Sequence, residues 1–440
     1  MTGLELLGLL MLTVMIGVIF IGFPISFTLL FLALTFGWFA MGNVVFDLAY
    51  FQTIGLMKEE VLAAVPLFIF MGYVVEQAGL MGRLFRAFQV ILAPLRGSLY
   101  LGVILTATVF AMATGIVGAA VTVLGIMAAP IMMKSGYDHR LSAGAIAAGG
   151  TLGILIPPSV MLVVMGPVMG VSVAQLYAAA FGPGFMLAAL YIIYCLTRSF
   201  INPKLGPPVP HDERVTSVVA MAREFVIGVI PLGALIAATL GTILGGLATP
   251  TEAASVGASG ALLLSLLYRR FTWGGLKTAA FSTMTTTSMV LFLAVASNVF
   301  GAVFAKLGSA TMITKTLIAL PVPPFVTLLL VMLLIFLLGW PFEWPAIILV
   351  FLPIFYPVVQ ALKFDPIWFG ALVAVNLQTA YLSPPVAMSA YYLRRVVPQW
   401  SLSTIYRGMA DFMVIQVIGL ILVMIFPQIA LWFPGWLFGR

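Results

Sequence analysis

Two proline pairs interrupt apolar segments at the same relative place in the two halves of this chain. Pro157-Pro158 lies in GGTLGILIPPSV, and Pro384-Pro385 lies in VNLQTAYLSPPV. Proline removes a backbone donor and clashes with the preceding turn, so each pair predicts a broken helix. Asp138 and Asp365 are separated by the same number of residues as Pro157 and Pro384, and we call this separation the repeat offset. The sequence therefore predicts two related halves, an arrangement typical of secondary transporters.

The composition excludes a water-soluble protein of this size. Hydrophobic residues make up 63% of the 440 residues and charged residues 8%, with a mean hydropathy of +1.19. Because backbone groups in lipid must pair internally, we expect an all-α polytopic membrane protein in contact with the bilayer. The single Cys195 excludes an internal disulfide, His139 and His211 stand beside charged loop residues, and nothing supports nucleic-acid binding.

Apolar stretches long enough to span a bilayer recur along the whole chain. We expect spans at 4–21, 24–42, 62–80, 142–171, 178–197, 225–246, 251–268, 284–303, 367–393 and 409–430. Residues 142–171 and 367–393 are the two expected broken helices.

Two further apolar stretches do not fit as spans. Residues 98–133 are too many for one helix and too few for two, since each half would reach only about 24 Å of a core of about 30 Å. We therefore predict a re-entrant hairpin with its tip at TGIVG, residues 114–118, where glycine suits a turn. Residues 324–360 repeat this pattern, with PFEWP (341–345) at the tip.

The distribution of basic residues predicts the orientation. With the amino terminus outside, 15 of the 20 Lys and Arg residues fall in the cytoplasm, as the positive-inside rule requires. The first hairpin then enters from the cytoplasm and the second from outside. This predicts an inverted repeat, with residues 1–215 as the first unit and residues 216–440 as the second.

We expect the binding site for ions and substrate at the two helix breaks. We expect the prolines to unwind Gly149–Gly153 in one half and Asn376–Thr379 in the other, freeing carbonyl oxygens that suit Na⁺. Ser159 and Ser383 stand beside the prolines and can donate hydrogen bonds to a carboxylate. A lone proline pair is as often a simple kink, but two at one offset favour a site.

Few acidic residues lie at membrane depth. Glu343 stands at the second hairpin tip, where solvation at the hairpin mouth and a role in the site compete evenly. Glu252 stands where a loop becomes a helix, and a first-turn acid with Thr249 or Thr251 as cap is the favoured interpretation over a proton carrier. Without paired buried carboxylates and a histidine relay, the sequence favours coupling to Na⁺ over H⁺.

Five motifs carry a family resemblance that covers essentially the whole chain. They are GGTLGILIPPSV, TGIVGAAVTVLG, TPTEAASVGA, LGWPFEWPAIILVFLPIF and FDPIWFGALVAVNLQTAYLSPP. In this combination the chain resembles the large membrane subunit, the DctM type or M subunit, of tripartite ATP-independent periplasmic (TRAP) transporters. The resemblance implies a Na⁺-driven importer of an organic acid, with elevator-type architecture in the bacterial inner membrane. It also implies two partners, a small four-helix membrane subunit and a periplasmic substrate-binding protein, and no cofactor besides Na⁺.

The same resemblance implies the site residues. The first Na⁺ site involves the first hairpin tip and the first break, at Thr114, Gly115, Gly118, Gly150, Thr151 and Gly153. The second involves the second tip and the second break, at Gly339, Glu343, Asn376, Gln378 and Thr379. Substrate is expected between the tips, near Pro158, Ser159, Thr379, Ser383 and Pro384.

The chain departs from many members of the family at both tips. Ala113, Thr114 and Gly115 replace a serine-rich stretch, and Pro341 and Pro345 stiffen the second turn. The NLQT form of the second motif is most similar to subfamilies that handle 2-oxo acids and related monocarboxylates.

Three other functions compete with this interpretation. One is an organic anion symporter, coupled to Na⁺ or H⁺, that needs no binding protein. An intramembrane enzyme is disfavoured because the chain has neither HExxH nor GxSxG and Cys195 has no nearby histidine, so we expect no enzyme. A passive channel is disfavoured because two hairpins of opposite entry suit alternating access better than a continuous pore.

Overall fold

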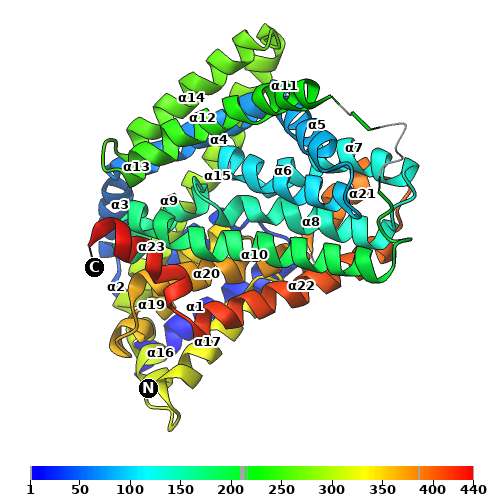
Figure 1. The fold of residues 1–440 in the computed structure, drawn as a ribbon. Coiled ribbons are helices and arrows are strands. Elements are labelled where there is room, and N and C mark those ends of the chain that lie inside the picture. Colours follow the sequence, from blue (N-terminus) through cyan, green and yellow to red (C-terminus); the bar gives the residue numbers. More distant parts are fainter. Residues whose placement is uncertain (1, 209–213, 216, 385–386, 440) are drawn as a thin grey trace.

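The protein is all-α over the described part of the chain. The computed structural model describes residues 2–208, 214, 215, 217–384 and 387–439, and these form helices and turns without β-strands (Figure 1). Within these residues, eight helices are long and apolar enough to cross a membrane, or nine if a pair bent by 41° counts as one span. These features fit the expected polytopic membrane protein. His211 and Pro385 lie outside the described residues.

The first part of the chain forms a continuous series of helices with short connections. Their bounds are α1 Gly3–Ile21, α2 Ile25–Met41, α3 Val44–Met57, the 3₁₀ helix η1 Glu60–Ala63, α4 Ala64–Gln77, α5 Leu80–Leu92, α6 Ser98–Thr114, α7 Val117–Lys134, α8 His139–Leu155, α9 Val160–Met169, α10 Val173–Ile201, α11 Val218–Gly228, α12 Ile230–Ile236 and the π-helix η3 Ala237–Gly241.

The remaining described helices follow the same pattern. Their bounds are α13 Thr242–Leu244, α14 Pro250–Leu267, α15 Trp273–Lys306, α16 Ser309–Ile318, α17 Pro324–Leu338, α18 Trp344–Ala346, the π-helix η4 Ile347–Phe351, α19 Leu352–Ala361, α20 Pro366–Leu382, α21 Met388–Val396, α22 Leu402–Ile425 and α23 Gln428–Phe438.

Seven of the ten expected spans correspond to helices of spanning length and hydropathy. The other three differ for two reasons. α2 and α20 are apolar but only 17 residues long, and α14 is not among the helices that meet the length and hydropathy test. The second arms of both predicted hairpins, residues 117–134 and 344–361, do meet it.

Helix bounds recur at the repeat offset in the two halves. The start and the end of α8 correspond by this offset to those of α20, and the start and the end of α7 correspond to Trp344 and Ala361. The caps agree as well, since Oδ1 of Asp138 accepts from the amide of Leu141 at 2.8 Å and Oδ1 of Asp365 accepts from Ile367 at 2.8 Å. Each aspartate satisfies donors that a helix start leaves open, and this stabilises the start by about 1 kcal/mol.

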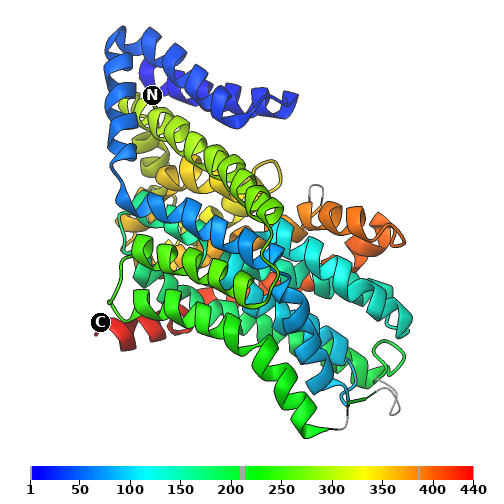
Figure 2. The same cartoon turned by 90° about the horizontal axis from the view of Figure 1, so that it is seen from above.

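α8 and α20 lie at the centre of the molecule. Every residue of α8 from Leu141 to Leu155 is buried, as is every residue of α20 from Ile367 to Thr379. α8 packs against α6, α7, α20 and α22, whereas α1–α3 lie along one edge beside α15 (Figure 2). A helix that is apolar and covered on all faces is a core element, so the two expected broken helices occupy the core.

Candidate functional site

The first break lies after the segment that we expected to unwind. α8 stays helical through Gly149–Gly153 to Leu155, and α9 starts at Val160 with a bend of 41°. The prediction was wrong because a proline removes its own N–H, and this frees a carbonyl four residues earlier without melting the turns before it. Pro157 and Pro158 thus leave the carbonyls of Gly153 and Ile154 without their helical donors. Ser159 Oγ donates to the Ile154 oxygen instead.

The first hairpin tip sits against this break. α6 ends at Thr114 and α7 begins at Val117, with Gly115 between them at a φ of +62°. A methyl group placed on Gly115 would lie 3.6 Å from the Pro158 oxygen and 3.8 Å from the Gly153 oxygen. Glycine is therefore required at position 115 for two reasons: the left-handed backbone conformation and the space beside these two carbonyl oxygens.

The second break has the same ending as the first. α20 remains helical through Asn376–Thr379, so the expected unwinding was wrong here too, for the same reason. Ser383 caps the helix, and its amide donates to the Thr379 oxygen at 2.9 Å. The Ser383 hydroxyl is buried and has no partner among the described residues, which leaves it available as a donor.

The second hairpin tip, residues 339–343, packs against α20. A methyl group on Gly339 would lie 2.8 Å from the Cβ of Ala380, so glycine permits this close approach. Asn376 Nδ2 donates to the Met332 oxygen of α17 at 2.7 Å, and Thr379 Oγ1 donates to the Asn376 oxygen. The second hairpin is thus held to α20 by packing and by one side-chain hydrogen bond.

Both tips open onto one cavity of about 400 Å³. Gly115 and Gly118 line it from the first tip, Glu343 from the second, and Tyr381 from α20. Its charged lining residues are Glu76, Glu343 and Arg395. One cavity with three charged lining residues therefore lies where the two hairpin tips approach the first break.

Comparison with known proteins identifies the family. The sequence profile described as "Tripartite ATP-independent periplasmic transporter, DctM component" matches residues 12–429. The chain belongs to this family. It is therefore a large permease subunit of a TRAP transporter, a multi-pass membrane protein and not an enzyme.

Named relatives share its full length. The chain is 30% identical to the sialic acid TRAP transporter large permease protein SiaM of Vibrio cholerae, over 96% of this chain and 97% of that one. It is 30% identical to the C4-dicarboxylate TRAP transporter large permease protein DctM of Pseudomonas aeruginosa, over 86% of each. It is 27% identical to the ectoine TRAP transporter large permease protein TeaC of Halomonas elongata, over 96% and 97%.

Solved structures with low sequence identity share the fold. The YdaH transporter of Alcanivorax borkumensis aligns with a TM-score of 0.63 at 18% identity, over 89% of this chain and 90% of that one. MtrF of Neisseria gonorrhoeae aligns with a TM-score of 0.59 at 14% identity, over 87% and 84%. At such identities the likeness concerns the fold alone.

A glutamine that the sequence interpretation missed joins the two central helices of this large permease. Gln416 of α22 donates from Nε2 to Thr151 Oγ1 at 3.2 Å and to Gln378 Oε1 at 3.3 Å. All three side chains are buried. A lone amide in the apolar stretch from Phe412 to Ile425 was the available signal, since such residues in membrane helices often make interhelical hydrogen bonds.

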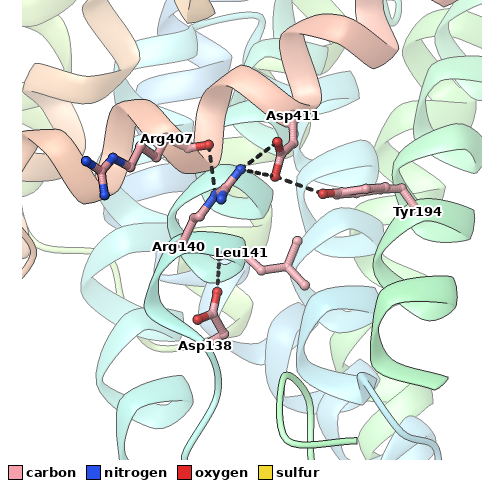
Figure 3. Close-up of polar contacts among 6 residues, drawn as sticks. All are labelled: Asp138, Arg140, Leu141, Tyr194, Arg407 and Asp411. Atoms are coloured by element: carbon pink, nitrogen blue, oxygen red, sulfur yellow. Dashed lines mark hydrogen bonds and ion pairs between the residues drawn. The ribbon is translucent and has the colours of Figure 1, made fainter. Parts of the chain in front are cut away.

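An ion pair ties the start of α8 to α22 (Figure 3). Arg140 Nη2 lies 2.7 Å and 2.9 Å from the two carboxylate oxygens of Asp411, and Arg140 Nε donates to the Arg407 oxygen at 3.1 Å. The hydroxyl of Tyr194 in α10 donates to Asp411 Oδ2 at 2.9 Å. Asp411 of α22 therefore binds one side chain from α8 and one from α10.

Most of the residues predicted for the site fall into two groups. The first group surrounds the cavity or the breaks beside it and comprises Gly115, Gly118, Gly153, Pro158, Ser159, Glu343 and Ser383. The second group is engaged between helices and comprises Thr151, Asn376 and Gln378, whereas the Thr379 hydroxyl donates to the Asn376 oxygen of its own helix.

Four of the predicted residues have other surroundings. Thr114 Oγ1 donates to the Phe110 oxygen of its own helix at 3.1 Å. Gly150 packs against Val121 of α7, and Gly339 against Ala380. Pro384 follows Ser383 directly at the end of α20. Of these, only Thr114 carries a side chain able to bind an ion, and its hydroxyl is turned toward its own helix.

Glu252 is not part of the site. Its carboxylate accepts from the Thr249 amide at 2.8 Å, and its own amide donates to Thr249 Oγ1 at 3.2 Å. This is a capping box at the start of α14. The structure therefore confirms the favoured interpretation of Glu252 as a first-turn acid.

Proposed function

We propose that this large permease imports an organic acid across the bacterial inner membrane by Na⁺ symport, with an elevator-like movement of the hairpins and central helices. The observation that carries the proposal is the meeting of both hairpin tips and the first break at one polar cavity. The recurrence of helix bounds at the repeat offset supports an inverted repeat of 1–215 and 216–440. Such repeats place substrate and coupling ions at their interface.

For the first Na⁺ we propose a site between Gly115 and the first break. The carbonyl oxygens of Gly153 and Pro158 border the space that Gly115 leaves open, and carbonyl oxygen is a suitable ligand for a small hard cation. For the second Na⁺ we propose the corresponding place beside α20, near Gly339 and Ser383. Thr151 and Gln378 then support the two sites indirectly and do not bind Na⁺ themselves, since both side chains already accept hydrogen bonds from Gln416.

The cavity favours a substrate with one carboxylate. Arg395 is the single cation among its described lining residues, and it accompanies the carboxylates of Glu76 and Glu343. One guanidinium pairs well with one carboxylate, whereas a second carboxylate would lie close to like charge. We therefore favour a monocarboxylate such as a 2-oxo acid, with the Ser159 and Ser383 region as further hydrogen-bonding surface.

The accessibility of Arg395 supports an inward-facing state. Arg395 lies in the group of basic residues that we expect on the cytoplasmic side, and it lines the same cavity as both hairpin tips. The proposed route out of the site therefore leads past α21 to the cytoplasm.

Two partners complete the proposed transporter. The family's large permeases work with a small permease and a periplasmic binding protein. The sialic acid TRAP transporter permease protein SiaT of Haemophilus influenzae supports the small subunit as a partner, because the match to this chain covers only 67% of SiaT. We propose that this chain binds both partners as different polypeptides.

Uptake into proteoliposomes tests the proposal. The chain is reconstituted with its small subunit, and its binding protein is loaded with the ligand with which it purifies. We expect uptake that requires an inward Na⁺ gradient and is competed by monocarboxylates more strongly than by dicarboxylates. Uptake indifferent to Na⁺ would remove the coupling proposal, and full uptake without binding protein would favour the symporter that needs none.

A further inference from the structure

Gln416 occupies a special position relative to the two halves of the chain. Its two acceptors, Thr151 and Gln378, are related by the repeat offset and lie at matching positions of α8 and α20. A single amide nitrogen thus connects corresponding points of the two central helices. An amide nitrogen carries two hydrogens, so both are used by this arrangement.

The hydrogen bonds from Gln416 to Thr151 and Gln378, which we call the bridge, place a polar side chain where an apolar one would be more stable. Gln416 is fully buried beside the Tyr191 hydroxyl of α10, and neither its Oε1 nor that hydroxyl has a partner with good hydrogen-bond geometry among the described residues. A buried polar atom without a partner lowers stability, and leucine or methionine at the same place would avoid that penalty. A polar residue kept at such a cost is expected where function requires it.

The bridge lies between the two places at which the hairpins contact the central helices. Thr151 is close in sequence to Gly153, whose oxygen borders Gly115 at the first tip. Gln378 is equally close to Asn376, whose side chain holds Met332 of the second hairpin. A displacement of either tip is therefore transmitted to Gln416 along only about half a helical turn of α8 or of α20.

We propose that Gln416 is a positioning residue that couples the two Na⁺ sites. The inference rests on the proposed Na⁺ symport and adds how the sites communicate. An ion bound beside Gly153 draws α8 into one position, Gln416 holds α20 to it, and the second site is then preformed. Coupling between sites requires such an element with contacts to both.

The test is the Na⁺ dependence of uptake by variants at position 416. Gln416→Met keeps the length of the side chain and removes both hydrogen bonds. We expect its Hill coefficient for Na⁺ to fall toward 1 and the Na⁺ concentration for half-maximal uptake to rise several-fold. Gln416→Glu keeps the acceptors but lacks the amide donors, and we expect the same loss. Gln399→Met, at an exposed glutamine outside the core, serves as the matched control.

A second readout does not depend on the partner proteins. The apparent unfolding temperature of the purified chain in detergent is measured against Na⁺ concentration, and we expect a cooperative rise for the wild type and a non-cooperative rise for Gln416→Met. Unchanged Hill coefficients for both Gln416→Met and Gln416→Glu would overturn the inference while leaving Na⁺ symport intact. Wild-type uptake without Na⁺ dependence would overturn the proposed function itself, and the coupling with it.

A second variant keeps the inference testable if Gln416→Met folds poorly. Thr151→Val removes one acceptor, nearly keeps the volume, and leaves the hydrogen bond from Gln416 to Gln378 in place. We expect it to lower the Hill coefficient as Gln416→Met does. Wild-type cooperativity in a folded Thr151→Val variant would count against the bridge.

Discussion

Gly115 shows how one missing side chain shapes the proposed ion site. Its φ of +62° belongs to a region that other residues enter at a cost of about 1–2 kcal/mol, and its bare Cα leaves the carbonyls of Gly153 and Pro158 accessible. The two requirements can be separated experimentally, because the chain offers a second glycine of similar backbone conformation without such neighbours.

We predict that Gly115→Ala raises the Na⁺ concentration for half-maximal uptake several-fold, because the added methyl group enters the space beside the two carbonyl oxygens. Gly136→Ala is the matched control, with a φ of +71° and nothing within 4 Å of the added methyl group. Both variants bear a similar backbone cost, so both are compared in Na⁺-dependent uptake after correction for the amount of protein. Equal behaviour of the two variants would mean that Gly115 serves only the turn.

The prolines and Gln416 show which features of the site can be predicted from the sequence and which cannot. The prolines located both breaks, because the loss of a backbone donor is a local property of the residue. The turns that would melt were predicted wrongly, because helical hydrogen bonds upstream of a freed carbonyl remain intact. Gln416 was missed because its partners are 265 and 38 residues away in the sequence, and such pairings depend on how helices pack.

At the scale of elements, the start of α8 is held by several polar contacts at the edge of the core. Asp138 caps the helix, and Arg140 pairs with Asp411 of α22 through two short contacts. Tyr194 adds a contact from α10. Charge-assisted hydrogen bonds to a planar guanidinium are among the stronger polar interactions, so this cluster contributes more than a typical surface pair.

We predict that Asp411→Asn lowers the free energy of unfolding by about 1–3 kcal/mol, since the arginine loses its charged partner and Tyr194 loses a carboxylate acceptor. The apparent unfolding temperature in detergent is the measurement. Glu224→Gln is the control, because its partner Arg86 lies at 3.6 Å with a side chain that is 70% exposed, against 47% for Arg140. An exposed pair of that kind contributes about 0–1 kcal/mol. A larger effect at Glu224 than at Asp411 would contradict this ranking.

The elements were largely predictable from the sequence. The helix ends at both tips, the central helices and most spans followed from hydropathy, length and two kinds of residue, proline and glycine, whereas the re-entrant course of the hairpins stays a prediction. The exact helical ends followed less well, because α10 and α15 extend to 29 and 34 residues, beyond what the bilayer core needs. Contacts with other helices, and not the thickness of the core alone, set those ends.

At the scale of the whole molecule, the proposed elevator requires the first hairpin to move relative to α4. Gly72 of α4 touches the hairpin tip, since a methyl group on it would lie 3.0 Å from the Cα and the carbonyl oxygen of Thr114 and 3.2 Å from its Cβ, so a side chain at position 72 requires a small shift of the tip. The distance between the two Cβ atoms is close to the spacing of about 3.5–4.5 Å between the Cβ atoms of a disulfide. The contact therefore provides a place to lock one state.

We predict that the variant Gly72→Cys with Thr114→Cys, in a Cys195→Ser background, loses uptake on oxidation and regains it on reduction. Cys195 is the single cysteine of the natural chain, so no other pairing within the chain competes. The reduced protein is its own control for any effect of the substitutions. Undiminished uptake by fully oxidised protein would show that this contact persists through the cycle, and the hairpin would not move against α4.

The glutamine bridge also bears on the history of the molecule. The position in α10 that corresponds to Gln416 by the repeat offset is Ala189, and no amide side chain occurs from Met186 to Ile192. If the halves descend from one duplicated gene, an ancestor with two identical units would have had this glutamine twice or not at all. The asymmetry is then younger than the duplication, whether the second half gained the glutamine or the first half lost it.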